Sequence, residues 1–239
     1  MTDLLRSSYR VRPGRQISTP VSRSAPSWWS TYPRRPIDAI RRHERIARRR
    51  DLALVLITSP LWLPVTALIA LMVRLQDPTA PTLFRQLRTG RDGKTFEVLK
   101  FRTMVKDAES KKQDLLHLNE LVWPDFKISN DPRVTRLGKL LRASSLDELP
   151  QLFNVLDGDM GLVGPRPTSF GLDTYEAWHT ARVDLRPGMT GLWQVAARAD
   201  IGWTERVRLE IAYQQRCCTR LDLEILLRTI GAVWNRSGS

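Results

Sequence analysis

Cysteine is nearly absent from this chain, since only Cys217 and Cys218 occur among its 239 residues. Two adjacent cysteines close no disulfide loop and do not have the spacing of metal ligands. The sequence therefore indicates neither a disulfide framework nor a cysteine metal site. It is compatible with a reducing cytoplasm.

Acidic residues and apolar runs are both scarce at the start of the chain. Residues 1–50 hold thirteen arginines but only Asp3, Asp38 and Glu44, so they carry +10 of the total net charge of +13. Five prolines stand among serines there, a composition that buries too little apolar surface to offset the entropy of ordering. We predict a disordered basic arm over residues 1–36 and, because the first apolar run follows about fifty polar residues, no amino-terminal signal peptide.

One long uncharged run extends from Leu52 to Val73. At about 1.5 Å per residue it could just cross a hydrocarbon core of roughly 30 Å. Pro60 and Pro64 each remove a backbone donor, so a kink is expected near Ser59, whose hydroxyl can bond a freed carbonyl. Basic residues flank both ends and favour placing both in the cytoplasm. A re-entrant helix broken at Ser59-Pro60 within residues 37–74 satisfies both observations, and a kinked spanning helix is the alternative.

Residues 75–239 have the composition of a mixed soluble domain, predicted to be α-rich α+β. A turn at Asp92-Gly93 leads into a strand over residues 95–101, from which Lys100 and Arg102 leave on the same side. Helices are predicted over residues 107–123, 135–143, 147–156, 204–216 and after 221.

A pair of like charges, Asp147 and Glu148, interrupts the otherwise apolar stretch "SSLDELPQL". One interpretation is structural: Ser145 and Glu148 match a capping box, and acidic residues in a first turn are stabilised by the helix dipole. Pro150, which belongs in a first turn, shifts the balance toward function, because it makes Asp147 an N-cap candidate whose carboxylate the backbone N–H groups keep ionised and available as a nucleophile or ligand. The other interpretation is functional, because many cations are near in sequence: Arg133, Arg136, Lys139, Arg142 and Arg166.

Cations around an anion indicate a phosphate site. A carboxylate that attacks phosphorus needs Arg, Lys or Mg²⁺ to shield the phosphoryl oxygens. Asp147 is then a candidate nucleophile, and Glu148 is a candidate ligand of the carboxylate-plus-phosphate kind that Mg²⁺ prefers.

Four segments carry a resemblance to a known family. They are "FRQLRTG" (84–90), "KFRTM" (100–104), "DPRVTRLGKLLRASSLDELPQLFNVLDGDMGLVGPRP" (131–167) and "RPGMTGLWQV" (186–195). In order and spacing they resemble the bacterial sugar transferase family, the monotopic phosphoglycosyl transferases. The resemblance covers roughly residues 50–234.

The resemblance implies transfer of a sugar 1-phosphate from a nucleotide sugar, usually a UDP-sugar, to a polyprenyl phosphate such as undecaprenyl phosphate, with release of UMP. It makes Asp147 the nucleophile of a covalent phosphosugar intermediate and gives Glu148 the Mg²⁺ contact. The remaining implied phosphate and nucleotide contacts are Lys100, Arg102, Arg142, Pro165, Arg166, Pro167, Arg186 and Arg198. The family's usual "QVSGR"-like and "GDMSLVGPRP" stretches are altered here to "QVAAR" and to a glycine at position 161, which puts local substrate contacts in doubt.

The resemblance also implies a location. The family has a re-entrant helix broken at a Ser-Pro pair, which Ser59-Pro60 matches, and interfacial amphipathic helices. We therefore expect a monotopic protein of the bacterial inner membrane, with its catalytic domain on the cytoplasmic side and the chain as a minimal catalytic form with an added arm. A homo-oligomer, joined through the apolar residues between Leu223 and Trp234, and downstream glycosyltransferases are further possible partners, and no nucleic acid is expected.

A different class of function is compatible with the arm alone. A membrane-anchored, non-enzymatic module could use its arginines to bind anionic lipid or nucleic acid, because each basic residue near an anionic surface contributes about 1 kcal/mol. That interpretation leaves the Asp147-Glu148 pair among ordered motifs unexplained. The sequence leaves the transferred sugar and the glycan pathway open.

Overall fold

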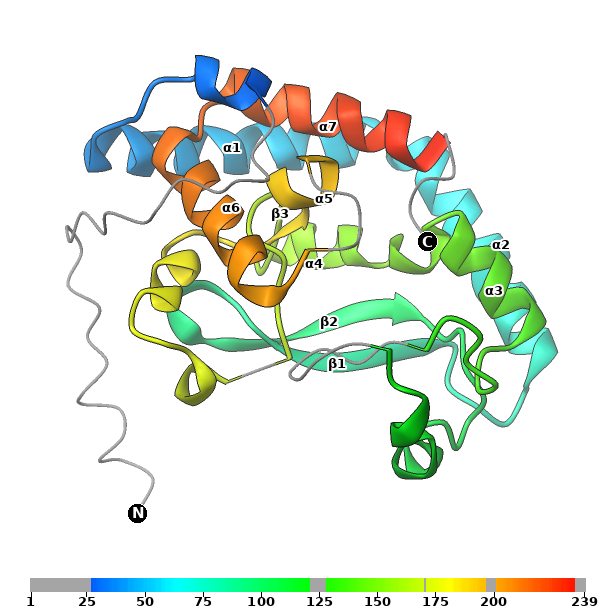
Figure 1. Cartoon of the computed structure of the whole chain (residues 1–239). Coiled ribbons are helices and arrows are strands. Elements are labelled where there is room, and N and C mark those ends of the chain that lie inside the picture. The colour runs from blue at the N-terminus through cyan, green and yellow to red at the C-terminus, as the bar shows by residue number, and fades with distance from the viewer. Residues whose placement is uncertain (1–26, 121–127, 170, 197–200, 235–239) are drawn as a thin grey trace.

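The computed structural model describes residues 27–120, 128–169, 171–196 and 201–234. Helices predominate over short strands in this part of the chain, as the sequence predicts. In Figure 1, α1 (Ile37–Ile57) and α7 (Thr219–Trp234) run side by side along one side of the molecule, and a β-hairpin runs along the opposite side. Between them lie α4 (Gln151–Asp157), α5 (Leu192–Ala196) and α6 (Trp203–Arg216).

The hairpin consists of β1 (Leu83–Thr89) and β2 (Thr95–Phe101), which pair antiparallel with Leu83 opposite Phe101. Asp92 and Gly93 both have positive φ, 55° and 74°, and form the tight connection. Such φ values suit Gly and, among other residues, Asp. The predicted strand over residues 95–101 and its turn are confirmed. A second, parallel pair joins β3 (Gly161–Val163) to β4 (Gly188–Thr190).

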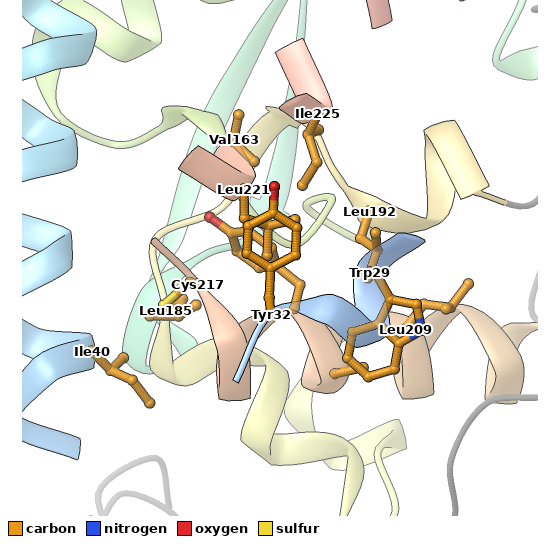
Figure 2. Close-up of a cluster of buried hydrophobic side chains, with 12 residues drawn as sticks. Trp29, Tyr32, Ile40, Val163, Leu185, Leu192, Leu209, Cys217, Leu221 and Ile225 are labelled. Carbon is orange, nitrogen blue, oxygen red and sulfur yellow. The ribbon is translucent and has the colours of Figure 1, made fainter. Parts of the chain in front are cut away.

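The largest buried apolar cluster joins the two ends of the described chain. Figure 2 shows Trp29 and Tyr32 packed among residues of α6 and α7 that include Leu209, Leu221 and Ile225. Trp29 belongs to a 3₁₀ turn, Ser27–Thr31, and the Tyr32 hydroxyl donates to Glu224 Oε2 at 2.6 Å. The prediction of disorder up to residue 36 is therefore wrong for residues 27–36. The Trp29 and Tyr32 side chains supply apolar area that packs against the core. The remainder of that prediction, residues 1–26, lies outside the described residues.

The apolar run breaks where the prolines predict. Helix α1 ends at Ile57, and α2 (Ser59–Gln76) starts again directly after Thr58. The Ser59 hydroxyl donates to the Leu56 carbonyl at 2.7 Å, as predicted, and the buried Trp62 indole donates to the Val55 carbonyl across the break at 3.0 Å. Pro64 lies inside α2 without ending it.

Helix α2 is the described helix that is long and apolar enough to cross a membrane, and 17 % of it is buried inside the protein. Leu61, Leu68 and Leu75 expose 74 %, 59 % and 70 % of their surface. Helix α7 has a similar apolar stripe, because Leu223, Leu227 and Ile230 are exposed while Leu221 and Ile225 face the core. Packing among the described residues does not explain these exposed stripes.

Helix α1 is tied to the rest of the domain by buried charges. Arg50 donates to Asp51 and to Asp222 of α7, at 2.7 Å each, and Asp222 also accepts from Tyr213 and pairs with His43. Asp51 in turn accepts from the backbone N–H of Leu162 in β3. Arg50, one of the basic residues that flank the apolar run, is thus paired with carboxylates inside the domain.

The other predicted helices are mostly confirmed. Helix α3 (Arg136–Ala143), α6 and α7 lie at the expected positions, and Thr135 caps α3 by accepting from the N–H of Gly138 at 3.0 Å. The helix predicted over residues 107–123 is instead a 3₁₀ segment, Ser110–Leu118, in which no residue is buried. Its leucine stripe finds no packing partner there, since Leu116 and Leu118 stay exposed, and residues 121–127 lie outside the described part.

Candidate active site

A cavity of about 1150 Å³ opens between the β1–β2 hairpin and helices α5 and α7. One part of its wall is polar and strongly cationic, and another part is apolar. The polar part includes Gln86, Arg88, Lys100, Arg102, Arg142, Asp147, Glu148 and Arg166. The apolar part includes Phe84, Met189, Val195, Ala232 and Val233.

The two adjacent carboxylates stand on a short 3₁₀ turn, Leu146–Glu148, between α3 and α4. Ser145 enters the turn with a left-handed φ of 56° and makes no side-chain cap, so the predicted capping box is wrong. Helix α4 begins later than predicted, at Gln151 with Pro150 before it, so Asp147 is not an N-cap. Leu146 and Leu149 pack against the core on either side of the carboxylates, which turns Asp147 and Glu148 toward the cavity.

Glu148 is held by two cations from distant parts of the chain. Its Oε1 atom accepts from Lys100 Nζ and from Arg166 Nη2, both at 2.6 Å. Burial alone would raise the pKa of Glu148, but the charges of Arg166 and Lys100 and their hydrogen bonds outweigh it and hold that pKa well below its ordinary value. Glu148 is therefore ionised, and its negative charge is balanced by Lys100 and Arg166, so it is not available as a free base.

Asp147, in contrast, has no hydrogen bond or ion pair with any residue that the structure describes. Its carboxyl group lines the cavity beside Glu148. Burial raises the pKa of Asp147, Lys100 opposes that rise, and the negative charge of Glu148 adds to it. The expectation that an N-cap position would favour the ionised form of Asp147 is therefore wrong: Asp147 is not an N-cap, and its pKa is raised and not lowered.

Two further cations of the cavity, Arg142 and Arg88, are placed by α3 and β1. The Arg142 Nε atom donates to Thr103 Oγ1 at 2.9 Å, which fixes the guanidinium at the rim. Arg88 donates to the Gln86 side chain and to the Pro167 carbonyl. Burial, together with the neighbouring charge of Arg166, lowers the pKa of Arg88 to about 10, so it remains a cation at neutral pH.

Arg88 and Gln86 are site residues that the sequence reasoning missed. Both belong to the motif "FRQLRTG", and with Phe84 they follow the two-residue period of β1 and point to one face. The two-residue alternation in this motif could have predicted from the sequence that these side chains lie on one face of the strand. Thr190 and Thr229 also line the cavity, with their hydroxyl oxygens 2.7 Å apart. Thr190 belongs to the motif "RPGMTGLWQV" but was not among the predicted contacts, and Thr229 lies outside the four motifs.

Several predicted site residues lie elsewhere. Arg186 lines a separate small cavity beside Glu44 of α1, and its backbone N–H donates to Glu44 at 3.4 Å. Arg198 lies outside the described residues. Pro165 and Pro167 flank Arg166 but do not line the cavity, and Arg133 is buried in an ion pair with Asp131.

The carboxylate pair fits a divalent ion only in part. Among the described residues, no group of three or more His, Cys, Asp or Glu side chains comes together. Glu148 Oε1 is already occupied by two cations, whereas Oε2 is approached only by Arg166 Nη1 at 3.5 Å, and Asp147 is free among described residues. Mg²⁺ commonly binds one or two carboxylates and completes its shell with water and substrate phosphate. The oxygens present suit an ion of that kind.

Comparison with known proteins places this arrangement in context. A family model described as "Bacterial sugar transferase" matches residues 42–236. The chain is 39 % identical over 194 residues to the undecaprenyl-phosphate galactose phosphotransferase of Salmonella typhimurium, which covers 79 % of this chain and 40 % of that protein. It is 42 % identical over 193 residues to the UDP-glucose:undecaprenyl-phosphate glucose-1-phosphate transferase of Caulobacter vibrioides, covering 75 % and 66 %.

A third relative matches over nearly its whole length. The exopolysaccharide production protein ExoY of Rhizobium meliloti is 36 % identical over 210 residues, which is 86 % of this chain and 90 % of ExoY. Four relatives, the Salmonella protein among them, are much longer, and the matched part of this chain spans between 33 % and 41 % of their length.

Proposed function

Since the chain belongs to the bacterial sugar transferase family, we propose that it transfers a sugar 1-phosphate from a UDP-sugar to undecaprenyl phosphate and releases UMP. The names of the Salmonella and Caulobacter relatives support this donor and acceptor chemistry. The name of ExoY supports a role in exopolysaccharide production, and we propose that this transfer is the step that initiates assembly of the glycan. The sugar differs between these relatives, galactose in one and glucose in another, so this chain's own sugar stays open.

The observation that carries the proposal is the contrast between the two adjacent carboxylates. Glu148 is paired with Lys100 and Arg166, whereas Asp147 faces the same cationic cavity with no partner among the described residues. A nucleophile needs free lone pairs, and a phosphate substrate needs cations close by. Asp147 has the free lone pairs, and the wall of the cavity supplies the cations.

In the proposed reaction an Asp147 oxygen attacks the phosphorus that carries the sugar. A bond forms between that oxygen and phosphorus, and the bond from phosphorus to the bridging oxygen breaks, so UMP leaves with the electron pair. An oxygen of undecaprenyl phosphate then attacks the same phosphorus and returns the Asp147 carboxylate. Arg88, Lys100, Arg142 and Arg166 hold the phosphate oxygens and reduce the repulsion between anions. A Mg²⁺ ion, held by Asp147 or Glu148 and the substrate phosphates, would supply further charge neutralisation.

The exposed apolar stripes support a membrane location for this reaction. We propose that α2 enters the cytoplasmic face of the inner membrane and, with the end of α1, forms a re-entrant helix broken at Ser59-Pro60, while the α7 stripe lies at the interface. The acceptor lipid and the soluble donor can then reach one cavity from two sides. If so, tags at the first and last residues are both labelled from the cytoplasmic side of inverted vesicles, whereas a spanning helix separates them.

The test of the reaction uses purified full-length protein with Mg²⁺, undecaprenyl phosphate and a panel of UDP-sugars. UMP release is expected with at least one sugar, and intact-mass analysis after exposure to donor alone should reveal a sugar-phosphate adduct on Asp147. Asp147→Asn keeps the size of the side chain and should abolish both signals. Asp157→Asn is the matched control, because Asp157 is exposed at the end of α4 and does not line the cavity.

Two outcomes contradict the proposal. Turnover by Asp147→Asn at the rate of the unmodified protein removes the covalent step. Absence of UMP release with every UDP-sugar, from protein that remains folded, removes the reaction.

A further inference from the structure

Arg166 stands on a tripeptide with a single backbone donor. Pro165 and Pro167 have no N–H, so the N–H of Arg166 is the one donor that this stretch can offer. Neighbouring links hold the ends of the loop: the Pro165 carbonyl accepts from Gly188, and the Pro167 carbonyl accepts from Arg88. The position of Arg166 therefore depends on what its own N–H and C=O groups bind.

A buried ion pair binds both of these groups. Glu210 of α6 accepts from the Arg166 N–H through Oε1 at 2.9 Å, and its Oε2 accepts from Arg182 Nε at 2.5 Å. Arg182 Nη2 then donates to the Arg166 carbonyl. Arg182 and Glu210 each expose only 3 % of their surface, and neither lines the cavity.

Arg182 is itself fixed on its remaining sides. Its Nη1 atom donates to the Tyr175 hydroxyl at 2.8 Å and to Thr168 Oγ1 at 3.3 Å. The Trp203 ring covers the guanidinium, with 5.1 Å between the central carbon and the ring centroid. A planar guanidinium with this many fixed donors presents one geometry, which an ammonium group would not reproduce.

We propose that Arg182 and Glu210 are positioning residues, which clamp the main chain of Arg166 so that its guanidinium reaches Glu148 and the substrate phosphates. The clamp converts a loop residue into a fixed part of the site, because both polar atoms of its main chain are bound by side chains from other elements. This inference rests on the proposed function for its catalytic consequence. Its structural part is independent of the reaction.

Hydrogen exchange tests the structural part without any substrate. Between residues 164 and 168 only Gly164, Arg166 and Thr168 carry an amide hydrogen, so mass spectrometry with fragmentation can follow Arg166 directly. In full-length protein, Glu210→Gln weakens a charge-assisted bond, and exchange at Arg166 should become faster by about tenfold. Asp222→Asn is the matched control: it disturbs another internal ion pair, between the fully buried Asp222 of α7 and Arg50 of α1, and should leave exchange at Arg166 within about twofold.

A double-mutant cycle tests the catalytic part. We expect Glu210→Gln and Arg182→Lys each to lower kcat/KM by about tenfold, whereas adding Glu210→Gln to Arg166→Ala should cost less than about twofold, because the clamp then has nothing left to position. A residue that only stabilises the fold would lower activity by the same factor in both backgrounds. Asp222→Asn is again the control for general destabilisation.

The outcomes separate this inference from the proposed function. Unchanged exchange at Arg166 in Glu210→Gln, or equal costs of that substitution with and without Arg166, overturns the clamp. Unmodified protein that releases no UMP from any sugar nucleotide refutes the proposed function, and the exchange experiment still decides whether Glu210 holds Arg166.

Discussion

Adjacent side chains in this site have different electrostatic roles because different parts of the chain reach them. Glu148 meets Lys100 from β2 and Arg166 from the loop after β3, and its pKa falls despite burial. Asp147, one residue earlier, has only the more distant charges, and burial raises its pKa. A free carboxyl group with a raised pKa next to a neutralised one supports the assignment of Asp147 as nucleophile.

The first prediction concerns pH. In the proposed reaction Asp147 must be ionised to attack, so the acid limb of kcat/KM should lie above the ordinary aspartate value of about 3.9. The positive charge of Arg142 opposes the rise in the pKa of Asp147, so Arg142→Gln should move the acid limb to still higher pH. A pH profile of UMP release measures the shift. Lys139→Gln, on the same helix but outside the cavity, should leave the limb in place, and a shift to lower pH in Arg142→Gln contradicts the argument.

The second prediction concerns Arg88. Its guanidinium stays charged, because its pKa of about 10 lies well above neutral pH, and it lines the cavity near Arg166. Arg88→Gln should lower kcat/KM by about a hundredfold, the effect expected on losing one donor to a developing phosphate charge. Arg85→Gln is matched in strand and in chemistry, but Arg85 is exposed and paired with Glu97, so activity should change less than about twofold. Equal effects of the two substitutions refute a phosphate role for Arg88.

Among the helices, α3 connects the hairpin to the turn that carries Asp147 and Glu148. Its Gly138 lies directly on the main chain of Thr103, and a Cβ atom there would come 2.0 Å from the Thr103 carbonyl oxygen. Thr103 in turn binds Arg142 through its hydroxyl. The close approach of α3 to the end of β2 therefore brings Arg142 and the Asp147 turn to the hairpin that carries Lys100.

The third prediction follows from this contact. Gly138→Ala forces α3 away from Thr103 and should destabilise the protein by about 2 kcal/mol or more, a cost in the range of backbone overpacking. Gly231→Ala is the control, since no described residue lies within 4 Å of the added atom in α7, and it should be neutral or stabilise the protein by up to about 1 kcal/mol. Thermal midpoints in detergent measure both. A Gly138→Ala protein as stable as the unmodified one contradicts the packing argument.

Across the chain as a whole, the start of the described part closes the core that α6 and α7 form. Trp29 stacks beneath Arg216, 4.3 Å from guanidinium carbon to ring centroid, and Tyr32 bonds Glu224. The boundary between the arm and the folded protein therefore lies before Ser27 and not at residue 36.

The fourth prediction uses this boundary. Deleting residues 1–26 should leave the thermal midpoint almost unchanged, whereas Trp29→Ala should cost about 3–5 kcal/mol, since it empties an aromatic site in the core. That corresponds to a fall in the midpoint on the order of 10 °C. The deletion also removes five arginines and one aspartate, so binding to anionic vesicles at low salt should weaken. A large loss of stability on deleting residues 1–26 contradicts this boundary.

Much of the architecture was predictable from local patterns. The strand over residues 95–101, helices α3, α6 and α7, and the break at Ser59 follow from β-branched content, helical periodicity and proline, and all of these act within a few residues. The described part of the helix predicted over residues 107–123 is not α-helical, because Leu116 and Leu118 have no packing partner among the described residues and stay exposed. Asp147 failed as an N-cap because Ser145 takes a left-handed conformation before the turn.

The residue types on which the proposed chemistry depends are properties of the linear chain: the paired carboxylates and the many arginines could be read from the sequence alone. Which carboxylate is free and which is neutralised was decided in three dimensions. Lys100 and Arg166 lie 48 and 18 residues from Glu148, and Arg182 and Glu210 hold Arg166 from still other elements. Burial and charge pairing act through space, so the ionisation of Asp147 and Glu148 follows from the folded arrangement and not from their neighbours along the chain.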